Sequence, residues 1–247
     1  MTSVGIIPAR YAASRFEGKV LANIAGKPMI QHVWENAKKA HLLDDLIIAC
    51  DDERIIKVVE KFGGKAVFTS KSHPSGTDRL REVANPLDVD IVVNIQADEP
   101  LLNHSMIDSL VAALNDDKDI VMASLMRKIE NYHDIDNYNV VKVVVDKNNF
   151  ALYFSRSTIP FIRNKHEMMN MHDLPFFKHI GIYAYTKDFL FSFANLPESD
   201  LEKCEKLEQL RALENGYKIK MVETKFDTIG VDTPEDLEKV KIKFLNT

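Results

Sequence analysis

The feature that most constrains the fold of this chain is an alternation, over the first 120 residues, of short apolar runs with longer segments of helical periodicity. Apolar runs typical of strands lie at 4–9, 46–49, 66–68 and at the start of 90–100, and helical segments lie at 26–42, 53–62 and 105–116. In the first helical segment Met29, Val33 and Ala37 share one face, and Pro28 suits the first turn. This pattern predicts parallel strands joined by right-handed helical crossovers, as in a doubly wound α/β sheet.

The sequence becomes richer in β-forming residues after about residue 120. These β-rich segments lie at 120–129, 140–157 and 177–190, with a hairpin turn expected at 145–152. They are expected to extend the sheet or to form an appended lobe. A helical stretch at 198–217, a strand at 218–224 and a helix at 233–245 follow, with Thr233 as the expected N-cap and Pro234 in the first turn. The segment 161–175 has no clean periodicity, so it is expected to be a loop, and its methionines could pack or line a lid.

Composition excludes several classes of protein. The 247 residues are 45% hydrophobic, which suits one large domain or a domain with a lobe. A net charge of -5 argues against a general nucleic-acid binder. Cys50 and Cys204 lie far apart and form no zinc or disulfide pattern. Since neither a leader nor an apolar stretch of about 18 residues is present, we expect a cytoplasmic protein that contacts no membrane.

The turn after the first strand carries positive charge on a flexible backbone. Arg10, Arg15 and Lys19 are separated by small residues, among them Ala12 and Gly18, and Ala9 before them would also allow close backbone approach. The loop after the first strand of an open α/β sheet commonly meets phosphate, and three cations could neutralise a triphosphate. The stretch matches neither the dinucleotide fingerprint nor the P-loop. Taken alone, it is equally consistent with a solvated turn.

Acidic residues follow two other predicted strands. Asp98 and Glu99 come directly after a buried run, and Asp232 precedes the last helix. Carboxylates at the ligand edge of a sheet are suitable ligands for Mg²⁺ bound to a nucleotide. An acidic turn and an ordinary helix start are the alternative interpretations. Because basic and acidic groups recur after three strands, a triphosphate and metal site is favoured over three coincidences.

The chain resembles the CMP-Kdo synthetases, which are 3-deoxy-manno-octulosonate cytidylyltransferases. The resemblance lies in segments that follow the family's order: IIPARYAASRFEGK, GKPMIQHV, SGTDRL, QADEP, ALYFSR, HIGIYAY, EKLEQLR and GVDTPEDLEKV. It implies an α/β nucleotide-diphospho-sugar transferase (GT-A-like) fold with a mixed, mostly parallel sheet. It also implies a homodimer that uses Mg²⁺ and transfers CMP from CTP to the sugar acid Kdo for lipopolysaccharide biosynthesis. The expected organisation is one domain, 1–247, with a nucleotide-binding part (1–120), a β-rich substrate and dimer lobe (121–195) and a C-terminal segment (196–247).

The resemblance also implies roles for individual residues. Lys19, Asp98 and Asp232 would be catalytic, with the two aspartates holding the metal. The CTP-binding residues would be Ala9, Arg10, Arg15, Lys19, Ser75, Gly76, Thr77, Arg79 and Gln96. Arg156 would bind the Kdo carboxylate, because a guanidinium fork matches that anion. The sugar hydroxyls would contact His179, Tyr183, Glu208 and Gln209. Without the resemblance, a buried structural histidine and a solvated glutamate would be the simpler interpretations of His179 and Glu208.

Two positions depart from the family pattern. Ala97 stands where the family has glycine, and its methyl group would cost binding if that position required a positive φ or touched the ribose. Glu17 stands where a proline is usual and places an acid among the cations. CMP transfer to 8-amino-Kdo or another sugar acid is an alternative reaction, as is a sugar-phosphate pyrophosphorylase. A non-catalytic nucleotide-binding regulator is the alternative from another class, and a dehydrogenase is disfavoured because the glycine fingerprint is missing.

Overall fold

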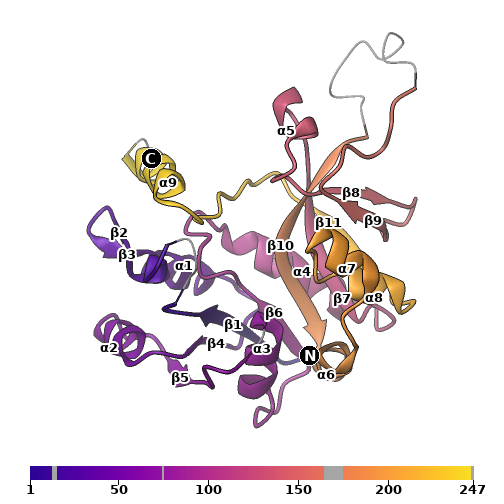
Figure 1. Ribbon diagram of the computed structural model, residues 1–247. Coiled ribbons are helices and arrows are strands. Elements are labelled where there is room, and N and C mark those ends of the chain that lie inside the picture. Colours follow the sequence, from indigo (N-terminus) through magenta and orange to yellow (C-terminus); the bar gives the residue numbers. More distant parts are fainter. Residues whose placement is uncertain (13–15, 74, 164–174, 246–247) are drawn as a thin grey trace.

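The computed structural model describes residues 1–12, 16–73, 75–163 and 175–245, which form a central sheet with helices on both faces (Figure 1). The strands are β1 Ser3–Ala9, β2 Asn23–Ile24, β3 Lys27–Pro28, β4 Asp45–Cys50, β5 Ala66–Phe68, β6 Ile91–Asn94, β7 Met122–Lys128, β8 Lys142–Val145, β9 Ala151–Ser155, β10 Phe177–Thr186 and β11 Lys220–Glu223. The helices are η1 Lys19–Leu21, α1 Met29–Ala37, α2 Glu53–Lys61, α3 Gly76–Ala84, α4 His104–Asp116, α5 Tyr132–Asp136, α6 Lys187–Asn195, α7 Asp200–Glu205, α8 Leu210–Glu214 and α9 Pro234–Leu245.

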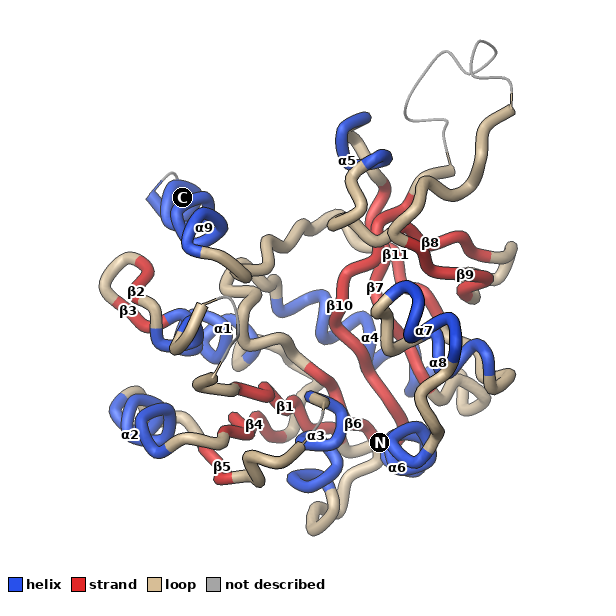
Figure 2. Tube along the Cα trace, in the orientation of Figure 1, coloured by secondary structure: helices blue, strands red, loops and turns tan. Residues whose placement is uncertain are grey.

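The main sheet has the strand order β11-β7-β10-β6-β1-β4-β5. Its β6-β1-β4-β5 part is parallel, which is the pattern predicted for the first 120 residues. Strand β10 runs antiparallel to β6 and β7, and β11 is parallel to β7. The β8-β9 hairpin is attached through β10, so the predicted extension of the sheet by the β-rich segments is confirmed. Most neighbouring pairs along this strand order are therefore parallel, and the sheet is mixed; its strands are red in Figure 2.

Two apolar clusters pack on opposite faces of the sheet. One joins α1, α2 and α4 to strand residues such as Ile7 and Ile48, which are fully buried. The other joins α3, α6 and α8 to strand residues such as Ile6 and Ile47. Successive strand residues point to opposite faces, so both faces are apolar and the strands read as continuous apolar runs. A smaller cluster packs α9 against Ile24 and Met29, which brings the last helix beside the first (Figure 1).

Several elements differ from the prediction. Pro28 precedes α1 as its N-cap with an extended backbone (φ -63°, ψ 146°), instead of lying in the first turn. The segment 177–190 was expected to be β-rich throughout, but its last residues begin α6. The helical stretch 198–217 is divided between α7 and α8, because Lys206 adopts a left-handed conformation (φ 55°). Most of the loop 161–175 lies outside the described residues.

Other predictions are confirmed in detail. Strand β5 has the predicted bounds, and β8 and β9 form the predicted hairpin. Thr233 caps α9, since its hydroxyl accepts a hydrogen bond from the Asp236 amide at 3.3 Å, and Pro234 begins the helix. In the part of the chain that the structure describes, no helix is long and apolar enough to cross a membrane.

Candidate active site

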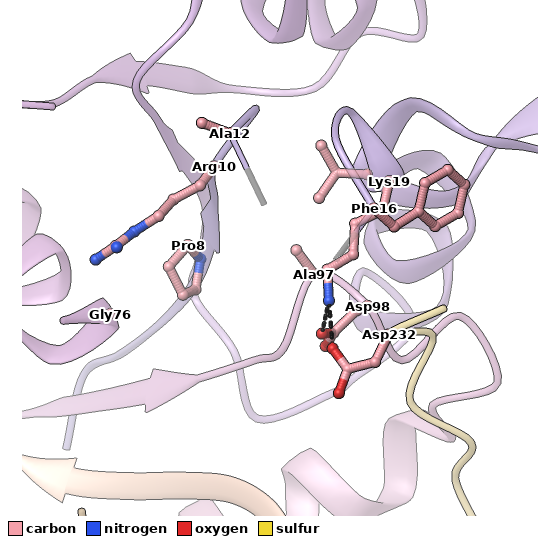
Figure 3. Close-up of a pocket in the computed structure, with 10 residues that line it drawn as sticks. Pro8, Arg10, Ala12, Phe16, Lys19, Gly76, Ala97, Asp98 and Asp232 are labelled. Carbon is pink, nitrogen blue, oxygen red and sulfur yellow. Dashed lines mark hydrogen bonds and ion pairs between the residues drawn. The ribbon is translucent and has the colours of Figure 1, made fainter. Parts of the chain in front are cut away.

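A cavity of about 270 Å³ opens where the carboxyl ends of β1 and β6 meet (Figure 3). We refer to it as the first cavity. Its lining residues come from the β1 loop, η1, the start of α3, the turn after β6 and the segment before α9: Pro8, Arg10, Ala12, Phe16, Lys19, Val20, Gly76, Ala97, Asp98 and Asp232. The fold therefore brings together five of the predicted residues, Arg10, Lys19, Gly76, Asp98 and Asp232. Arg15 lies outside the described residues.

Lys19 connects the two aspartates of the first cavity. Its Nζ lies 2.7 Å from Asp98 Oδ2 and 2.8 Å from Asp232 Oδ1 (Figure 3). Burial lowers the pKa of Lys19, but the charges and hydrogen bonds of Asp98 and Asp232 outweigh burial and raise the pKa above its ordinary value. The ammonium therefore stays protonated at neutral pH and compensates two carboxylates that would otherwise repel each other.

The opposite side of the first cavity is formed by Arg10, which extends toward the start of α3 (Figure 3). Its Nη2 donates to the His73 carbonyl oxygen at 3.0 Å, so the guanidinium is oriented by the segment before that helix. Tyr11 follows in the chain, and the Arg54 guanidinium stacks 3.3 Å from the centre of its ring. The Tyr11 amide also donates to Asp51 Oδ1 at 3.2 Å. The β1 loop is thus held by side chains from the β4–α2 turn.

Helix α3 carries three predicted CTP-binding residues into different surroundings. Ser75 is its N-cap, and its hydroxyl accepts from the Asp78 amide. Thr77 is buried and donates to Glu208 Oε2 at 2.8 Å. Arg79 has no exposed surface, and its Nη2 pairs with Asp51 Oδ2 at 3.0 Å. In this structure Arg79 therefore contacts the β1 loop indirectly, through Asp51, the residue that accepts from the Tyr11 amide.

Two other predicted CTP-binding residues also lie behind the surface of the first cavity. Ala9 is fully buried at the end of β1. The Gln96 side chain donates from Nε2 to the Gly181 carbonyl oxygen at 3.0 Å, which links the turn after β6 to a bulge in β10. Both residues thus help to position the backbone around the first cavity.

A second cavity, of about 380 Å³, lies over the antiparallel part of the sheet. It is lined by residues from β10, from the turn after β6, from the segment before α8 and from the two connections 139–141 and 227–230. Its polar lining residues include the predicted sugar-binding residues His179, Tyr183 and Gln209, together with Glu99, Lys178, Asp227 and Thr228. Asp98 lines the first cavity and Glu99 lines the second, so both cavities lie against the same turn.

His179 is held as a neutral imidazole. Burial lowers its pKa to about 3, and its Nε2 lies 2.9 Å from Ser124 Oγ. The Ser124 hydroxyl has its single proton directed at the carbonyl oxygens of Ile180 and Ile182, at 3.2 and 2.9 Å. Ser124 must therefore accept from Nε2–H, which leaves Nδ1 as the acceptor nitrogen of the ring.

The second cavity also contains polar atoms that have no protein partner. Glu99 Oε2 and Gln209 Nε2 are buried, and the described part of the chain offers neither a hydrogen bond. Burial, with a smaller contribution from the Asp98 charge, raises the pKa of Glu99 to about 8. Burial likewise raises the pKa of Glu208, against the hydrogen bond from Thr77 and the charge of Arg211. Buried groups without partners are expected where a polar ligand completes the hydrogen bonding.

The structure places Arg156 and Glu208 beside the second cavity without making them part of its lining. Arg156 Nε donates to the Glu205 carbonyl oxygen at 2.8 Å, and its Nη1 donates to the Tyr138 carbonyl oxygen at 3.1 Å. Glu208 faces Thr77, as described above. Sequence reasoning named Glu99 beside Asp98 as a possible magnesium ligand, but Glu99 lines the second cavity and not the first, and Lys178, Asp227 and Thr228 were missed. For Lys178 the available signal was adjacency, since it precedes His179.

The donor set of the first cavity fits Mg²⁺ better than a metal held by protein alone. Among the described residues, no group of three or more His, Cys, Asp or Glu side chains could hold a metal ion. Two carboxylates, however, converge on one ammonium. Mg²⁺ commonly takes one or two carboxylates and completes its shell with substrate phosphates and water. Asp98 and Asp232 match that requirement.

Neither departure from the family pattern strains the backbone or places a charge in the lining of the first cavity. Ala97 lines the first cavity, and it is not one of the three described non-glycine residues with a positive φ, Ala25, Asn149 and Lys206. Its backbone therefore needs no glycine. Glu17 is exposed and is not a lining residue, so its carboxylate faces solvent.

Comparisons with known proteins agree with one another. The cytidylyltransferase family model matches residues 4–219. The chain is 54% identical to a 3-deoxy-manno-octulosonate cytidylyltransferase of Geotalea daltonii, over 97% of both chains. It is 55% identical to the protein of that name from Syntrophobacter fumaroxidans, over 97% of this chain and 96% of the other.

Solved structures of other proteins show the same fold. A CMP:2-keto-3-deoxy-manno-octonic acid synthetase complexed with CTP superposes with a TM-score of 0.92 at 42% identity, covering 100% of this chain and 99% of the other. A glucose-1-phosphate thymidylyltransferase from Bacillus anthracis, at 17% identity and a TM-score of 0.68, shares the fold.

Proposed function

This chain belongs to the cytidylyltransferase family, and we propose that it transfers CMP from CTP to 3-deoxy-manno-octulosonate (Kdo), releasing diphosphate. The observation that carries the proposal is the pair of cavities on either side of the 98–99 peptide. One is lined by cations and two convergent carboxylates, and the other by polar groups, two of which have a buried atom without a hydrogen-bond partner among the described residues. A nucleotide and a sugar bound there would meet at this turn.

CTP is proposed to occupy the first cavity. Arg10 and Lys19 are its cationic lining residues among those described, and they suit the phosphates of a nucleoside triphosphate. Arg15 belongs to the same loop and remains proposed as a third cation. The start of α3 at Gly76 also lines the cavity, and an anion near a helix N-terminus is favoured.

Kdo is proposed to occupy the second cavity. A neutral His179, the phenol of Tyr183 and the unpaired amide of Gln209 suit the hydroxyl groups of a sugar. Burial keeps the pKa of Tyr183 well above its ordinary value, so the phenol remains a donor. Glu99 Oε2 has no partner among the described residues and would hydrogen-bond either a hydroxyl or an amino group, so 8-amino-Kdo is retained as an alternative acceptor.

The proposed reaction is an in-line displacement. The C2 hydroxyl oxygen of Kdo attacks the α-phosphorus of CTP, and diphosphate leaves. Arg10 and Lys19 would orient the phosphates and offset the charge that develops on them, and Asp98 and Asp232 would hold Mg²⁺. When bound there, Mg²⁺ would supply further stabilisation of the charge on the phosphate oxygens. No covalent bond to the protein is required, so positioning and charge are the main contributions of these side chains.

The proposal is tested by ³¹P NMR of the protein with CTP, Mg²⁺ and Kdo. We expect the CTP signals to be replaced by equal amounts of diphosphate and one phosphodiester. Formation of CDP and phosphate, or release of diphosphate without a phosphodiester, would contradict transfer to the sugar. Binding of CTP without any turnover would favour the non-catalytic regulator.

Asp98→Asn tests the proposed metal role. We expect turnover to fall by a factor of about 1,000 or more, because the carboxylate charge is lost at the position where metal and phosphate would meet. The thermal midpoint should stay close to that of the unmodified protein. Asp200→Asn, at the start of α7, is the matched control because its side chain is 95% exposed, and it should retain activity. Undiminished turnover in folded Asp98→Asn protein would contradict the metal role.

We further propose that the protein is a cytoplasmic homodimer. The β8-β9 hairpin is the proposed interface, because Leu152 is 62% exposed on β9 and the hairpin lies at the edge of the molecule (Figure 1). Sedimentation velocity would detect the dimer. A monomer at micromolar concentration would contradict this part of the proposal.

A further inference from the structure

The guanidinium of Arg10 is oriented by one hydrogen bond. Among the described residues, the structure gives Arg10 one hydrogen-bond partner, the His73 carbonyl oxygen at 3.0 Å from Nη2, and no ion pair. A guanidinium carries five N–H donors, so four remain for the oxygens of an anion in the first cavity. The position of those donors therefore depends on where the His73 backbone lies.

A second guanidinium lies close to Arg10. Burial lowers the pKa of Arg79, and the Arg10 charge lowers it further, against the charge and hydrogen bond of Asp51. Arg10 is thus near enough to Arg79 for the two charges to repel each other. Because of this repulsion, the His73 carbonyl oxygen is needed to keep Arg10 in one place.

The segment 70–73, between β5 and α3, is itself attached to α3 through Glu82. The His73 ring contacts Glu82 Oε2 through Nε2, and the same oxygen accepts from the Ser70 amide at 3.1 Å. The hydrogen bond from His73 keeps the pKa of Glu82 below its ordinary value, against the effect of burial. Glu82 is therefore a carboxylate at neutral pH and accepts from Nε2–H. Both ends of the segment are thus held by one side chain of α3.

We propose that Glu82 and His73 position Arg10 for the phosphates of CTP. The contacts lead from Glu82 to the His73 ring, and from the His73 backbone to the Arg10 guanidinium. Glu82 and His73 do not line the first cavity, whereas Arg10 does, so they are positioning residues that act through Arg10. This inference deepens the proposed function and rests on it.

The test measures the affinity for a CTP analogue whose α,β-methylene bridge prevents turnover, by calorimetry with Mg²⁺ present. Arg10→Gln should weaken binding by about 30-fold, as for the loss of a hydrogen bond between charged groups. Glu82→Ala and His73→Ala break the same pair from its two sides, and each should weaken binding by about 10-fold. Glu82→Gln keeps an acceptor for both hydrogen bonds and should lose less affinity than Glu82→Ala. The matched control is Glu60→Ala, an exposed glutamate on α2, which should bind as the unmodified protein does.

A double variant separates positioning of Arg10 from a general structural effect. Arg10→Gln combined with Glu82→Ala should bind the analogue within about 2-fold of Arg10→Gln alone, because no guanidinium is left to position. Independent effects would instead multiply to about 300-fold. Urea unfolding of each variant checks that the protein remains folded at the temperature of the binding measurement.

The possible outcomes separate this inference from the proposed function. The inference is wrong if folded Glu82→Ala and His73→Ala bind the analogue as the unmodified protein does, if Glu82→Gln loses as much affinity as Glu82→Ala, or if the losses in the double variant multiply. Expected binding results without turnover of Kdo would support the inference and contradict transfer to that sugar. If the unmodified protein does not bind the CTP analogue, the proposed function and this inference both fail.

Discussion

At the scale of single residues, the positive charge of Lys19 compensates the two carboxylates of the first cavity, as a bound metal ion would. The Lys19 ammonium is within 2.8 Å of a carboxylate oxygen of both Asp98 and Asp232. Mg²⁺ bound there, as proposed, would meet the same two oxygens, so the Lys19 side chain would have to move to admit it. Asp98 was identifiable from the sequence because it closely follows β6, whereas the strand expected directly before Asp232 is not formed: β11 ends at Glu223, and Asp232 lies just before α9. Their shared contact with Lys19 was not identifiable, since 79 and 213 residues separate the partners.

Lys19→Met should therefore increase the response of the protein to metal alone. Without the ammonium the two carboxylates repel each other, and Mg²⁺ would relieve that repulsion. We expect 10 mM Mg²⁺ without CTP to raise the thermal midpoint of Lys19→Met by about 3 °C more than that of the unmodified protein. Lys27→Met is the matched control, because Lys27 pairs with Glu35 outside the first cavity. Equal shifts in all three proteins would contradict the account.

His179 should make the protein sensitive to acid. Its pKa is about 3 in the folded state, whereas an unfolded histidine titrates near 6.5. Between these values the unfolded chain binds a proton that the folded chain does not. The free energy of unfolding should therefore fall as pH falls through this window, by up to about 1.4 kcal/mol per pH unit from this group.

The measurement is urea unfolding at pH 7 and at pH 4.5, compared between variants. His179→Gln should lose less stability on acidification than the unmodified protein. His133→Gln, which changes an exposed histidine, should lose as much as the unmodified protein does. An unchanged pH dependence in His179→Gln would contradict the assignment of this acid sensitivity to the buried His179 ring.

At the scale of elements, α3 connects the two cavities. Gly76 at its start lines the first cavity, and Thr77 donates to Glu208, the residue that precedes Gln209 of the second cavity. Arg79 anchors the same helix to Asp51 in the interior. A displacement of α3 would therefore change the geometry of both cavities. These contacts give a structural reason why SGTDRL is among the segments that carry the family resemblance.

Arg79→Gln should destabilise the protein strongly and weaken its use of CTP. It leaves Asp51 as a buried charge without its partner, which typically costs about 3–5 kcal/mol. Asp51 also holds the Tyr11 amide, so the KM for CTP should rise as the β1 loop loosens. Urea unfolding and initial rates measure the two effects. Arg81→Gln, on the same helix with an exposed hydrogen bond to Asn195, should change both by little, and similar effects of the two variants would contradict the role of Arg79.

The sequence predicted strands better than it predicted helices. Strand β5 has the expected bounds, and the hairpin turn expected at 145–152 is formed by 146–150, because apolar runs bounded by turn residues are local signals. Helix α6 was missed because Phe189 and Leu190 continue the apolar run of β10. The available signal was Thr186, whose hydroxyl accepts from the Phe189 amide at 3.3 Å. The break between α7 and α8 depends on a left-handed Lys206, which no residue preference would indicate.

At the scale of the whole molecule, the sheet order decides which residues meet. Strands β1 and β6 are neighbours although 81 residues lie between Ala9 and Ile91, so the β1 loop and the 96–99 turn reach the same edge. The sequence predicted this meeting from strand ends alone. It could not predict the second cavity, because β10 enters the sheet antiparallel between β6 and β7 and brings Lys178 and His179 beside Glu99. No local sequence pattern indicates that a strand will lie between two strands that come much earlier in the chain.

The central claim is that the two cavities hold CTP and a sugar acid for one transfer reaction. The most direct measurement is the initial rate of diphosphate release from CTP and Mg²⁺, with Kdo and 8-amino-Kdo offered separately and with EDTA controls. We expect release that requires both metal and Kdo. Release with 8-amino-Kdo alone would keep the mechanism and change the acceptor. No release with either sugar, from protein that binds CTP, would contradict the claim.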